Sequence, residues 1–311
     1  MNFKKILITG SSGLLGAHLM MALSRAHEVM GIDRHPWWGD QPLPMHVGDL
    51  TDATLLGEVI GAAEPDVLLH CAALVNVDAC ERDAAQAYAL NAQLTSVLAR
   101  AVPRTCLVVY VSTDGIFQGD RPNATEEDLP CPRTVYARSK LHGEWEVQQA
   151  TENHLIVRTN FYGWSSGRKE TAAEWLYHAL EAERAITLFD DFFFSPIYVV
   201  DFVERLTWLI EGGSRGLVHL SGRERISKYQ FGALMARAAG FSMAKVRRGS
   251  IDDAHLSARR PKDMSLDCRR FATLTGKDLP GCLEGLQRFL EDRSRRLSAR
   301  VGTRQDSSVA V

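Results

Sequence analysis

The sequence predicts an α/β fold with a doubly wound parallel sheet and a smaller C-terminal lobe, and three observations support this prediction. Short β-branched runs alternate with helical patterns through the first half of the chain. The apolar runs are continuous rather than alternating, as expected of strands covered on both faces. A glycine-rich turn follows the first run directly. Strand–helix alternation of this kind predicts right-handed crossovers and parallel pairing.

The predicted elements follow one another in a regular order. The strands are expected at residues 4–9, 27–33, 65–73, 106–113 and 154–160. The helices between them are expected at residues 13–26, 51–63, 83–102 and 138–151, where apolar residues recur at helical spacing. Beyond residue 160 the rhythm changes, with helices expected at 171–184 and 227–241 and short strands at 186–191 and 216–222.

Because the regular alternation of strands and helices ends near residue 160, we predict that the chain has three parts. Residues 1–164 form a dinucleotide-binding domain of the Rossmann type, with returns to its sheet near 195–222. Residues 165–292 form most of a substrate-binding lobe. Residues 293–311 are charged, then small and polar, without an apolar period, and are predicted to be a disordered tail.

Composition excludes several classes of function. The 311 residues are 45% hydrophobic and 24% charged, enough for a large core. With 36 basic and 38 acidic residues the net charge is −2, which predicts no nucleic-acid partner and no anionic membrane surface. No apolar run reaches the roughly 20 residues of a membrane span, and the run "ILIT" is too short for a signal-peptide core. We therefore expect a cytoplasmic protein.

Cysteine and histidine spacing predicts no metal site. The six cysteines are widely spread without a C-x-x-C pair, so we expect reduced and buried thiols. The ten histidines are scattered without ligand spacing.

The turn "TGSSGLLG" after the first strand predicts a dinucleotide site. Gly10, Gly13 and Gly16, with Leu14 and Leu15 between the last two, stand where the chain enters a helix. Glycines there allow a pyrophosphate to approach the backbone, and the helix N-terminus supplies N–H donors.

Two further segments bear on the choice of dinucleotide. Asp33 ends the second strand, where a carboxylate accepts hydrogen bonds from ribose hydroxyls, which favours NAD(H). The neighbouring Arg34 can pair with a 2′-phosphate, so NADP(H) stays open. Asp49 and Leu50 are expected near the adenine, although a helix cap by Thr51 or Asp52 uses the same segment equally well.

A hydroxyl, a tyrosine and a lysine predict carbonyl reduction. Tyr136 and Lys140 are four residues apart and project from one face of a helix. A carbonyl that accepts hydride needs a proton donor, and a tyrosine with a lowered pKa beside a lysine ammonium supplies one. Ser112 or Thr113, at the end of the fourth strand, can hydrogen-bond the same oxygen. The alternative is that these residues have no catalytic role: Tyr136 lies at the edge of the core, Lys140 is solvated, and Ser112 and Thr113 only end a strand.

Over about residues 3–291 the chain resembles the extended short-chain dehydrogenase/reductases, and most closely the dTDP-4-dehydrorhamnose reductase family. The resemblance is carried by "TGSSGLLG", "VSTDGIFQG", "VYARSK", "IVRTNFYGW" and "ARRPKDMSLD". It implies that Thr113, rather than Ser112, acts with Tyr136 and Lys140, and that Asn91 supports the active-site strand. It also implies that Ala72 and Ala73 border the cofactor. The implied substrate residues are Ser112, Asp114, Gly115, Asn160, Phe161 and Arg260.

The resemblance implies a function and leaves alternatives. The expected activity is NAD(P)H-dependent reduction of the 4-keto group of a nucleotide-linked deoxysugar, in a homodimer. Gly115 and Phe161 stand where that family usually has tyrosine and tryptophan, which leaves the identity of the sugar open. An epimerase or another keto-sugar oxidoreductase is one alternative. A non-catalytic dinucleotide-binding subunit, similar to the regulatory beta subunit of methionine adenosyltransferase, is the other.

Overall fold

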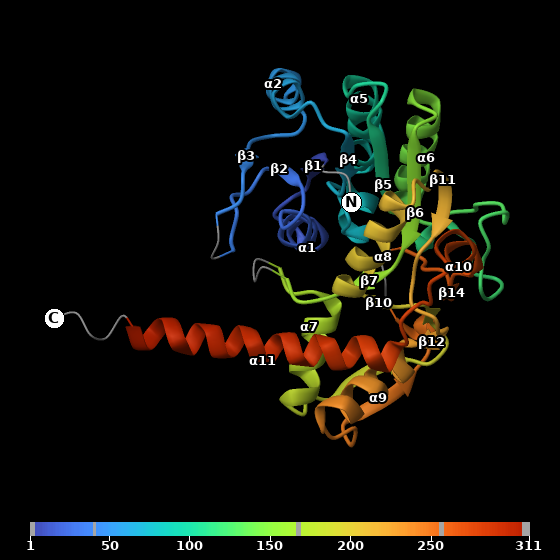
Figure 1. The fold of residues 1–311 in the computed structure, drawn as a ribbon. Helices are drawn as coiled ribbons and strands as arrows, with labels where there is room; N and C mark the ends of the chain where they lie inside the picture. The colour runs from blue at the N-terminus through green and yellow to red at the C-terminus, as the bar shows by residue number, and fades with distance from the viewer. Residues whose placement is uncertain (1–3, 40–41, 166–168, 255–257, 307–311) are drawn as a thin grey trace.

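A seven-stranded parallel sheet forms the centre of the computed structural model, which describes residues 4–39, 42–165, 169–254 and 258–306 (Figure 1). The strand order is β3-β2-β1-β4-β5-β6-β11, the doubly wound order that the alternating pattern predicts, so the fold class is confirmed. The strands are β1 Lys5–Thr9, β2 Glu28–Asp33, β3 Met45–Val47, β4 Val67–His70, β5 Leu107–Thr113, β6 His154–Thr159 and β11 Gly216–His219.

Helices cover both faces of this sheet, as its continuous apolar strands require. Alternate side chains of β1 enter different cores: Ile6 and Ile8 pack in one with α1 and α8, and Leu7 packs in the other with α2 and α5. The bounds of these helices, with that of α6, are α1 Leu14–Leu23, α2 Ala53–Ala63, α5 Leu94–Ala101, α6 Val135–Ala150 and α8 Val199–Glu211.

The connection between β4 and β5 is less regular than the single predicted helix at 83–102. It consists of α3 Val77–Arg82, α4 Ala84–Tyr88, the π-helical turn η1 Ala89–Gln93 and then α5. Within η1 the Asn91 carbonyl accepts hydrogen bonds from Tyr110 Oη at 2.9 Å and Thr95 Oγ1 at 3.0 Å. A π turn widens the backbone and is common at functional sites. Here it places Asn91 against β5.

Three small sheets lie outside the central sheet, with orders β10-β7, β12-β9-β14 and β13-β8. We call the part that contains α7, α9, α11 and the last two of these sheets the second lobe. Figure 1 shows α7, α9 and α11 lying together below the central sheet. Capping boxes at Thr171 and Ser227 start α7 and α9. The bounds are η2 Asp114–Ile116, β7 Phe161–Tyr162, α7 Ala172–Glu181, β8 Ile186–Phe189, β9 Phe193–Phe194, β10 Ile197–Tyr198, β12 Ile226–Ser227, α9 Lys228–Ala239, β13 Val246–Gly249, η3 Ile251–Asp253, β14 Asp263–Met264, α10 Arg269–Thr275 and α11 Cys282–Asp306.

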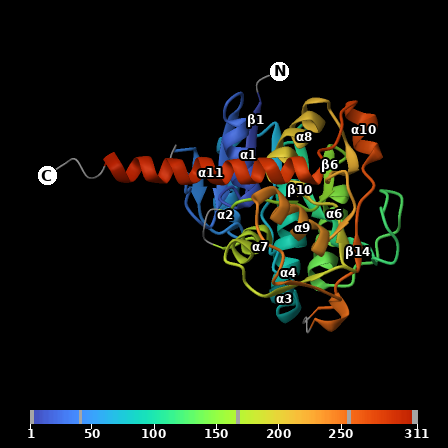
Figure 2. The same ribbon diagram turned by 90° about the horizontal axis from the view of Figure 1, so that it is seen from below.

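The C-terminal segment differs from the prediction of disorder. Helix α11 continues through residue 306, and both views show its far end projecting from the body (Figures 1 and 2). Arg293 anchors the helix by donating to Glu181 at 2.9 Å, and Asp292 accepts from Tyr198 Oη at 2.5 Å. The backbone stays helical from there to residue 306, although these residues have no apolar period. Residues 307–311 lie outside the described part.

Two further expectations concerned membrane spans and the state of the cysteines. No described helix has the length and apolar character to cross a membrane. All six cysteines are free thiols. Four of them are buried as expected, but Cys71 is half-buried and Cys131 is exposed.

Candidate active site

The glycine turn between β1 and α1 has the shape that close backbone approach requires. Gly10 has φ +67°, and a Cβ there would lie 2.7 Å from the Ala72 nitrogen. A Cβ at Gly16 would overlap the Gly10 carbonyl oxygen. Gly13 is the N-cap of α1 and has no side chain to bond the first-turn N–H groups. These donors are therefore open to an anion. Leu14 is half-buried and Leu15 is buried in the core beneath the turn.

Asp33 lies at the edge of the same turn. Its carboxylate accepts hydrogen bonds from the backbone nitrogens of Ser12 and His35, both at 3.1 Å. Arg34 is exposed beside it, where its guanidinium is accessible to a 2′-phosphate. The structure therefore brings the predicted Asp33 to the glycine turn and keeps Arg34 available.

The segment 49–52 was predicted either to border the adenine or to cap a helix, and the structure shows the helix cap. Asp49 accepts from the nitrogen and the hydroxyl of Thr51, both at 2.8 Å, and these bonds lower the pKa of its carboxyl with help from the charge of Arg34. Asp52 is the N-cap of α2. The side chain of Leu50 is buried in the core, so only its backbone remains available to an adenine.

The predicted residues after β4 lie against the glycine turn. The Ala72 nitrogen donates to Thr9 Oγ1 at 3.3 Å, next to Gly10. Asn91 fixes the same segment, because its side chain accepts from the Leu74 nitrogen at 2.8 Å and donates to Ser139 Oγ of α6 at 2.9 Å. Ala73 lies between these two anchors.

Ser112 and Thr113 point to opposite sides of β5, since successive strand residues alternate. Ser112 Oγ donates to Glu144 at 2.5 Å, and Glu144 also pairs with Arg158 at 2.7 Å. The sequence assigns Ser112 to the substrate, and this contact instead commits its hydroxyl to a buried ion pair. Thr113 Oγ1 caps η2 by accepting from the Gly115 nitrogen at 3.1 Å.

Tyr136 reaches Thr113 from the first turn of α6. Burial raises the pKa of the Tyr136 phenol above its ordinary value of 10.0, and a hydrogen bond with Thr113 opposes that shift. The sequence argument expects a lowered pKa, so the direction is opposite, because burial outweighs the hydrogen bond. The phenol therefore keeps its proton at neutral pH. Thr134 starts this helix by accepting from the Ala137 nitrogen at 3.1 Å.

Lys140 follows one turn later and is buried. Its Nζ lies 3.9 Å from the centroid of the Tyr110 ring. Burial lowers the Lys140 pKa to about 7, while the charges of Glu144 and Cys71 oppose that shift. Tyr136, Lys140 and Glu144 thus share one face of α6 at four-residue spacing. That spacing is the signal in the sequence from which Glu144 can also be selected.

Asp114 brings a second group of side chains to the same place. Asn160 Nδ2 donates to Asp114 Oδ2 at 2.6 Å, and Thr113 Oγ1 donates to Oδ1 at 3.2 Å. Burial raises the Asp114 pKa to about 6, opposed by the Asn160 hydrogen bond and the charge of Lys228. Lys228 begins α9 in the second lobe, and sequence reasoning does not select it.

The remaining predicted substrate residues are not equally close to this group. A Cβ at Gly115 would lie 3.5 Å from Thr113 Oγ1 and 3.9 Å from Met264 Sδ, so Gly115 borders it. The Phe161 ring packs 5.6 Å from the Phe202 ring of α8. Arg260 pairs with Asp78 of α3 at 3.1 Å, joining the second lobe to the first.

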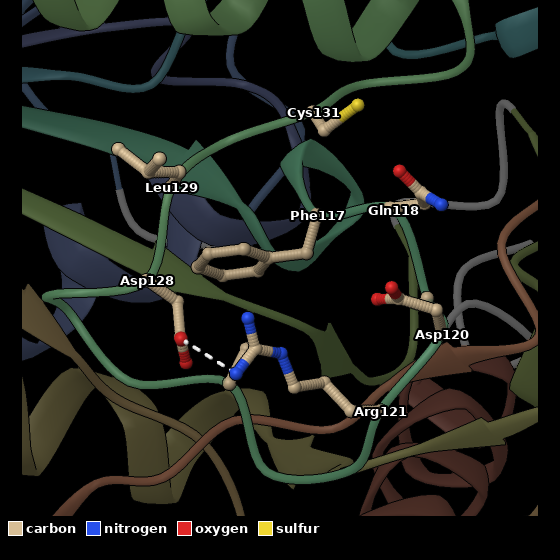
Figure 3. A pocket seen from close by; sticks show the side chains of 9 residues that line it. Phe117, Gln118, Asp120, Arg121, Asp128, Leu129 and Cys131 are labelled. Carbon is tan, nitrogen blue, oxygen red and sulfur yellow. Dashed lines mark ion pairs between the residues drawn. The ribbon is translucent and has the colours of Figure 1, made fainter.

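A separate cavity of about 210 Å³ lies in the loop after β5. Figure 3 shows the side chains that line it. Arg121 and Asp128 form an ion pair across it at 3.4 Å, and Arg121 is largely exposed. Its lining residues are Phe117, Gln118, Gly119, Asp120, Arg121, Ala124, Asp128, Leu129 and Cys131. Thr113, Tyr136 and Lys140 are not among them, so this cavity is distinct from the tyrosine site.

Comparison with known proteins agrees with the site geometry. The chain is 31% identical over 278 residues to a dTDP-4-dehydrorhamnose reductase of Mycobacterium tuberculosis, covering 86% of each protein. It is 29% identical over 305 residues to methionine adenosyltransferase 2 subunit beta of Rattus norvegicus, covering 93% of this chain and 89% of that protein.

Solved structures give the same result. A dTDP-4-dehydrorhamnose reductase from Bacillus anthracis in complex with NADP superimposes with a TM-score of 0.83 at 28% identity, covering 94% of this chain and 100% of that chain. The family described as "RmlD substrate binding domain" matches residues 4–295. This chain belongs to that family.

Proposed function

We propose that this protein is an NAD(P)H-dependent reductase of the 4-keto group of a nucleotide-linked deoxysugar. The observation that carries the proposal is the contact between Thr113 at the end of β5 and Tyr136 in the first turn of α6. This contact lies at the carboxyl end of the central strands, where doubly wound sheets bind ligands. The 31% identical reductase and the NADP complex support the same chemistry.

The first lobe fits a dinucleotide. The glycine turn leaves no room for a Cβ at Gly10 or Gly16, and the first N–H groups of α1 have no side-chain cap. When bound, the reduced dinucleotide supplies the hydride. Asp33 and Arg34 stand at the ribose end, and we keep NAD(H) and NADP(H) as equal possibilities.

Tyr136, Thr113 and Lys140 then act on different parts of the substrate and the cofactor. Tyr136 gives its proton to the carbonyl oxygen, and its raised pKa keeps that proton in place beforehand. Thr113 orients the same oxygen through its hydroxyl. Lys140, whose ammonium form Glu144 favours, hydrogen-bonds the nicotinamide ribose and stabilises the charge that develops on Tyr136. We further propose a cytoplasmic location and a homodimer.

Replacing Tyr136 by phenylalanine tests the mechanism. We expect Tyr136→Phe to lower kcat by about 10²-fold to 10⁴-fold, because the proton donor is lost. Dinucleotide affinity should stay unchanged, as measured by calorimetry. The matched control is Tyr88→Phe, a half-buried tyrosine of α4 that packs on His142, and its kcat should not change. Equal turnover in both variants would refute the mechanism.

The similarity to methionine adenosyltransferase 2 subunit beta supports a second candidate, a dinucleotide-binding subunit without turnover. The assay follows loss of reduced-nicotinamide absorbance with NADH or NADPH and a panel of nucleotide-linked 4-keto-6-deoxysugars. Turnover of one sugar favours the reductase. Tight dinucleotide binding without turnover of any sugar favours the regulatory subunit.

A further inference from the structure

A lysine of the second lobe lies beside the proposed catalytic group. Lys228 is the first residue of α9, and its Nζ lies 3.2 Å from the centroid of the Phe194 ring and 5.2 Å from that of Phe192. Asp114 is the charge that opposes the burial of this ammonium. Phe194 pairs with Met264 across β9 and β14, and Met264 Sδ borders Gly115, the residue after Asp114. The Lys228 ammonium therefore lies in the part of the second lobe that packs beside the end of β5.

The position of Lys228 at the start of α9 does not favour a lysine. A cation in the first turn of a helix opposes the macrodipole, which favours anions there. Burial lowers the Lys228 pKa to about 8. The helix starts at Ser227, whose capping box with Gln230 needs no lysine in the next position. Residues that break local rules without local gain are concentrated at functional sites.

The Lys228 ammonium also has unused donors. Across the part of the chain that the structure describes, no hydrogen-bond acceptor and no carboxylate within 4.0 Å pairs with its Nζ. An ammonium has three N–H groups to donate. The Asp114 carboxylate accepts from Asn160 and Thr113 and keeps further lone pairs. The ammonium and the carboxylate thus both keep hydrogen-bonding capacity for a ligand.

We propose that Lys228 and Asp114 together bind a hydroxyl group of the sugar, on the ring carbon next to the reacting carbonyl. Lys228 donates to the hydroxyl oxygen, and Asp114 accepts the hydroxyl hydrogen. Because Asp114 follows Thr113, this hydroxyl is adjacent to the oxygen that Thr113 orients. In a 4-keto-6-deoxyhexose it is the hydroxyl on carbon 3. This inference rests on the proposed reductase function and narrows its substrates to sugars that keep that hydroxyl.

The test compares two nucleotide-linked 4-keto-6-deoxysugars, one with the 3-hydroxyl and one without it. We expect the unaltered protein to favour the 3-hydroxy sugar by at least about 100-fold in kcat/KM, because a site built to bond a hydroxyl rejects its deoxy analogue. Lys228→Met should lose most of this preference, with an unchanged KM for the dinucleotide. Lys228→Gln, which keeps an N–H donor, should lose less.

Two further measurements make the result decisive. Lys245→Met is the matched control, since Lys245 is an exposed lysine of the second lobe that pairs with Glu183 at 3.7 Å. Its preference should equal that of the unaltered protein. If Lys228→Met also keeps the full preference, the inference fails while the reductase stands.

If the unaltered protein reduces neither sugar, the proposed function fails. The role of Lys228 is then decided by calorimetry with two nucleotide-linked 6-deoxysugars that carry a hydroxyl in place of the 4-keto group, one with the 3-hydroxyl and one without it. Weaker binding of the 3-hydroxy compound by Lys228→Met would support the contact. Equal binding by both proteins, or no binding by the unaltered one, would overturn it.

Discussion

Ser112 and Thr113 are neighbours in sequence, yet the polar groups on the two sides of β5 are arranged differently. On the Ser112 side, Glu144 accepts from both Ser112 and Arg158, and its side chain is only 3% exposed. On the Thr113 side, Tyr136 and Asp114 both bond to Thr113, and the nearby Lys228 ammonium has no acceptor among the described residues. The closed arrangement holds the helix against the sheet, whereas the open one leaves groups available to a ligand.

Removing Glu144, which holds together the closed arrangement of Ser112, Glu144 and Arg158, should have the largest effect on stability. Glu144→Ala leaves Arg158 as a buried charge without its partner and should lower the free energy of unfolding by about 3–5 kcal/mol. Chemical denaturation measures the change. Glu204→Ala is the control, since Glu204 is half-exposed and pairs with Arg205 at 3.1 Å, and it should cost less than about 1 kcal/mol. If both variants lose the same free energy of unfolding, the buried Glu144–Arg158 pair stabilises the fold no more than a surface ion pair does.

Exchanging the two hydroxyls one at a time sharpens the comparison. Thr113→Val keeps the shape of the side chain but removes the group that orients the carbonyl, so kcat should fall about 10²-fold. Ser112→Ala should change kcat by less than about threefold. Its effect should appear as a loss of about 1–3 kcal/mol in stability, because Glu144 loses a donor. A larger kcat loss for Ser112→Ala would place its hydroxyl in the reaction.

The buried Asp114 predicts a pH-dependent difference in stability. Its pKa is raised from 3.8 to about 6, so the folded protein binds this proton more tightly than the unfolded chain does. The resulting destabilisation is absent below pH 3.8, grows as pH rises toward 6 and is complete above it. Asp114→Asn removes the charge and should gain about 2–3 kcal/mol over the unaltered protein at pH 7.5.

Denaturation at pH 4 and pH 7.5 measures this gain. The two proteins should differ least at the lower pH. A constant difference at both values would show that the Asp114 pKa is not raised.

The smallest effect is expected at Gly115. Its backbone needs no positive φ, and an added Cβ would make only ordinary contacts with Thr113, Ala137 and Met264. Gly115→Ala should therefore change stability by less than about 0.5 kcal/mol. Thermal melting and sugar kinetics measure this, with Gly16→Ala as the contrasting variant that should abolish dinucleotide binding. A large loss for Gly115→Ala would mean that the substrate fills this space.

Local patterns in the sequence were enough to predict one part of this site. The glycine spacing and the four-residue step from Tyr136 to Lys140 are set within a single turn or helix, so they can be recognised without a fold. Both hydroxyls reach side chains of α6, Ser112 through Glu144 and Thr113 through Tyr136, so contact with α6 does not decide between them, and only the family resemblance favoured Thr113. Lys228 comes near Asp114 only through the packing of two lobes, and no spacing in the chain encodes that proximity.

The helical C-terminal segment was missed for a different reason. An apolar period is evidence for a helix that packs along its length, and α11 extends beyond the body it packs on. Past Arg293 the helix has no such period, and a search for periodicity therefore does not detect it.

The last strand of the central sheet has a consequence for synthesis of the protein. β11 pairs with β6 through residues 216–219, after the chain has passed through α7 and β8 of the second lobe. A nascent chain that has emerged only to residue 164 therefore presents β6 as an open edge, which is prone to pairing with other chains. The dinucleotide domain can complete its sheet on the ribosome only after much of the second lobe has been translated.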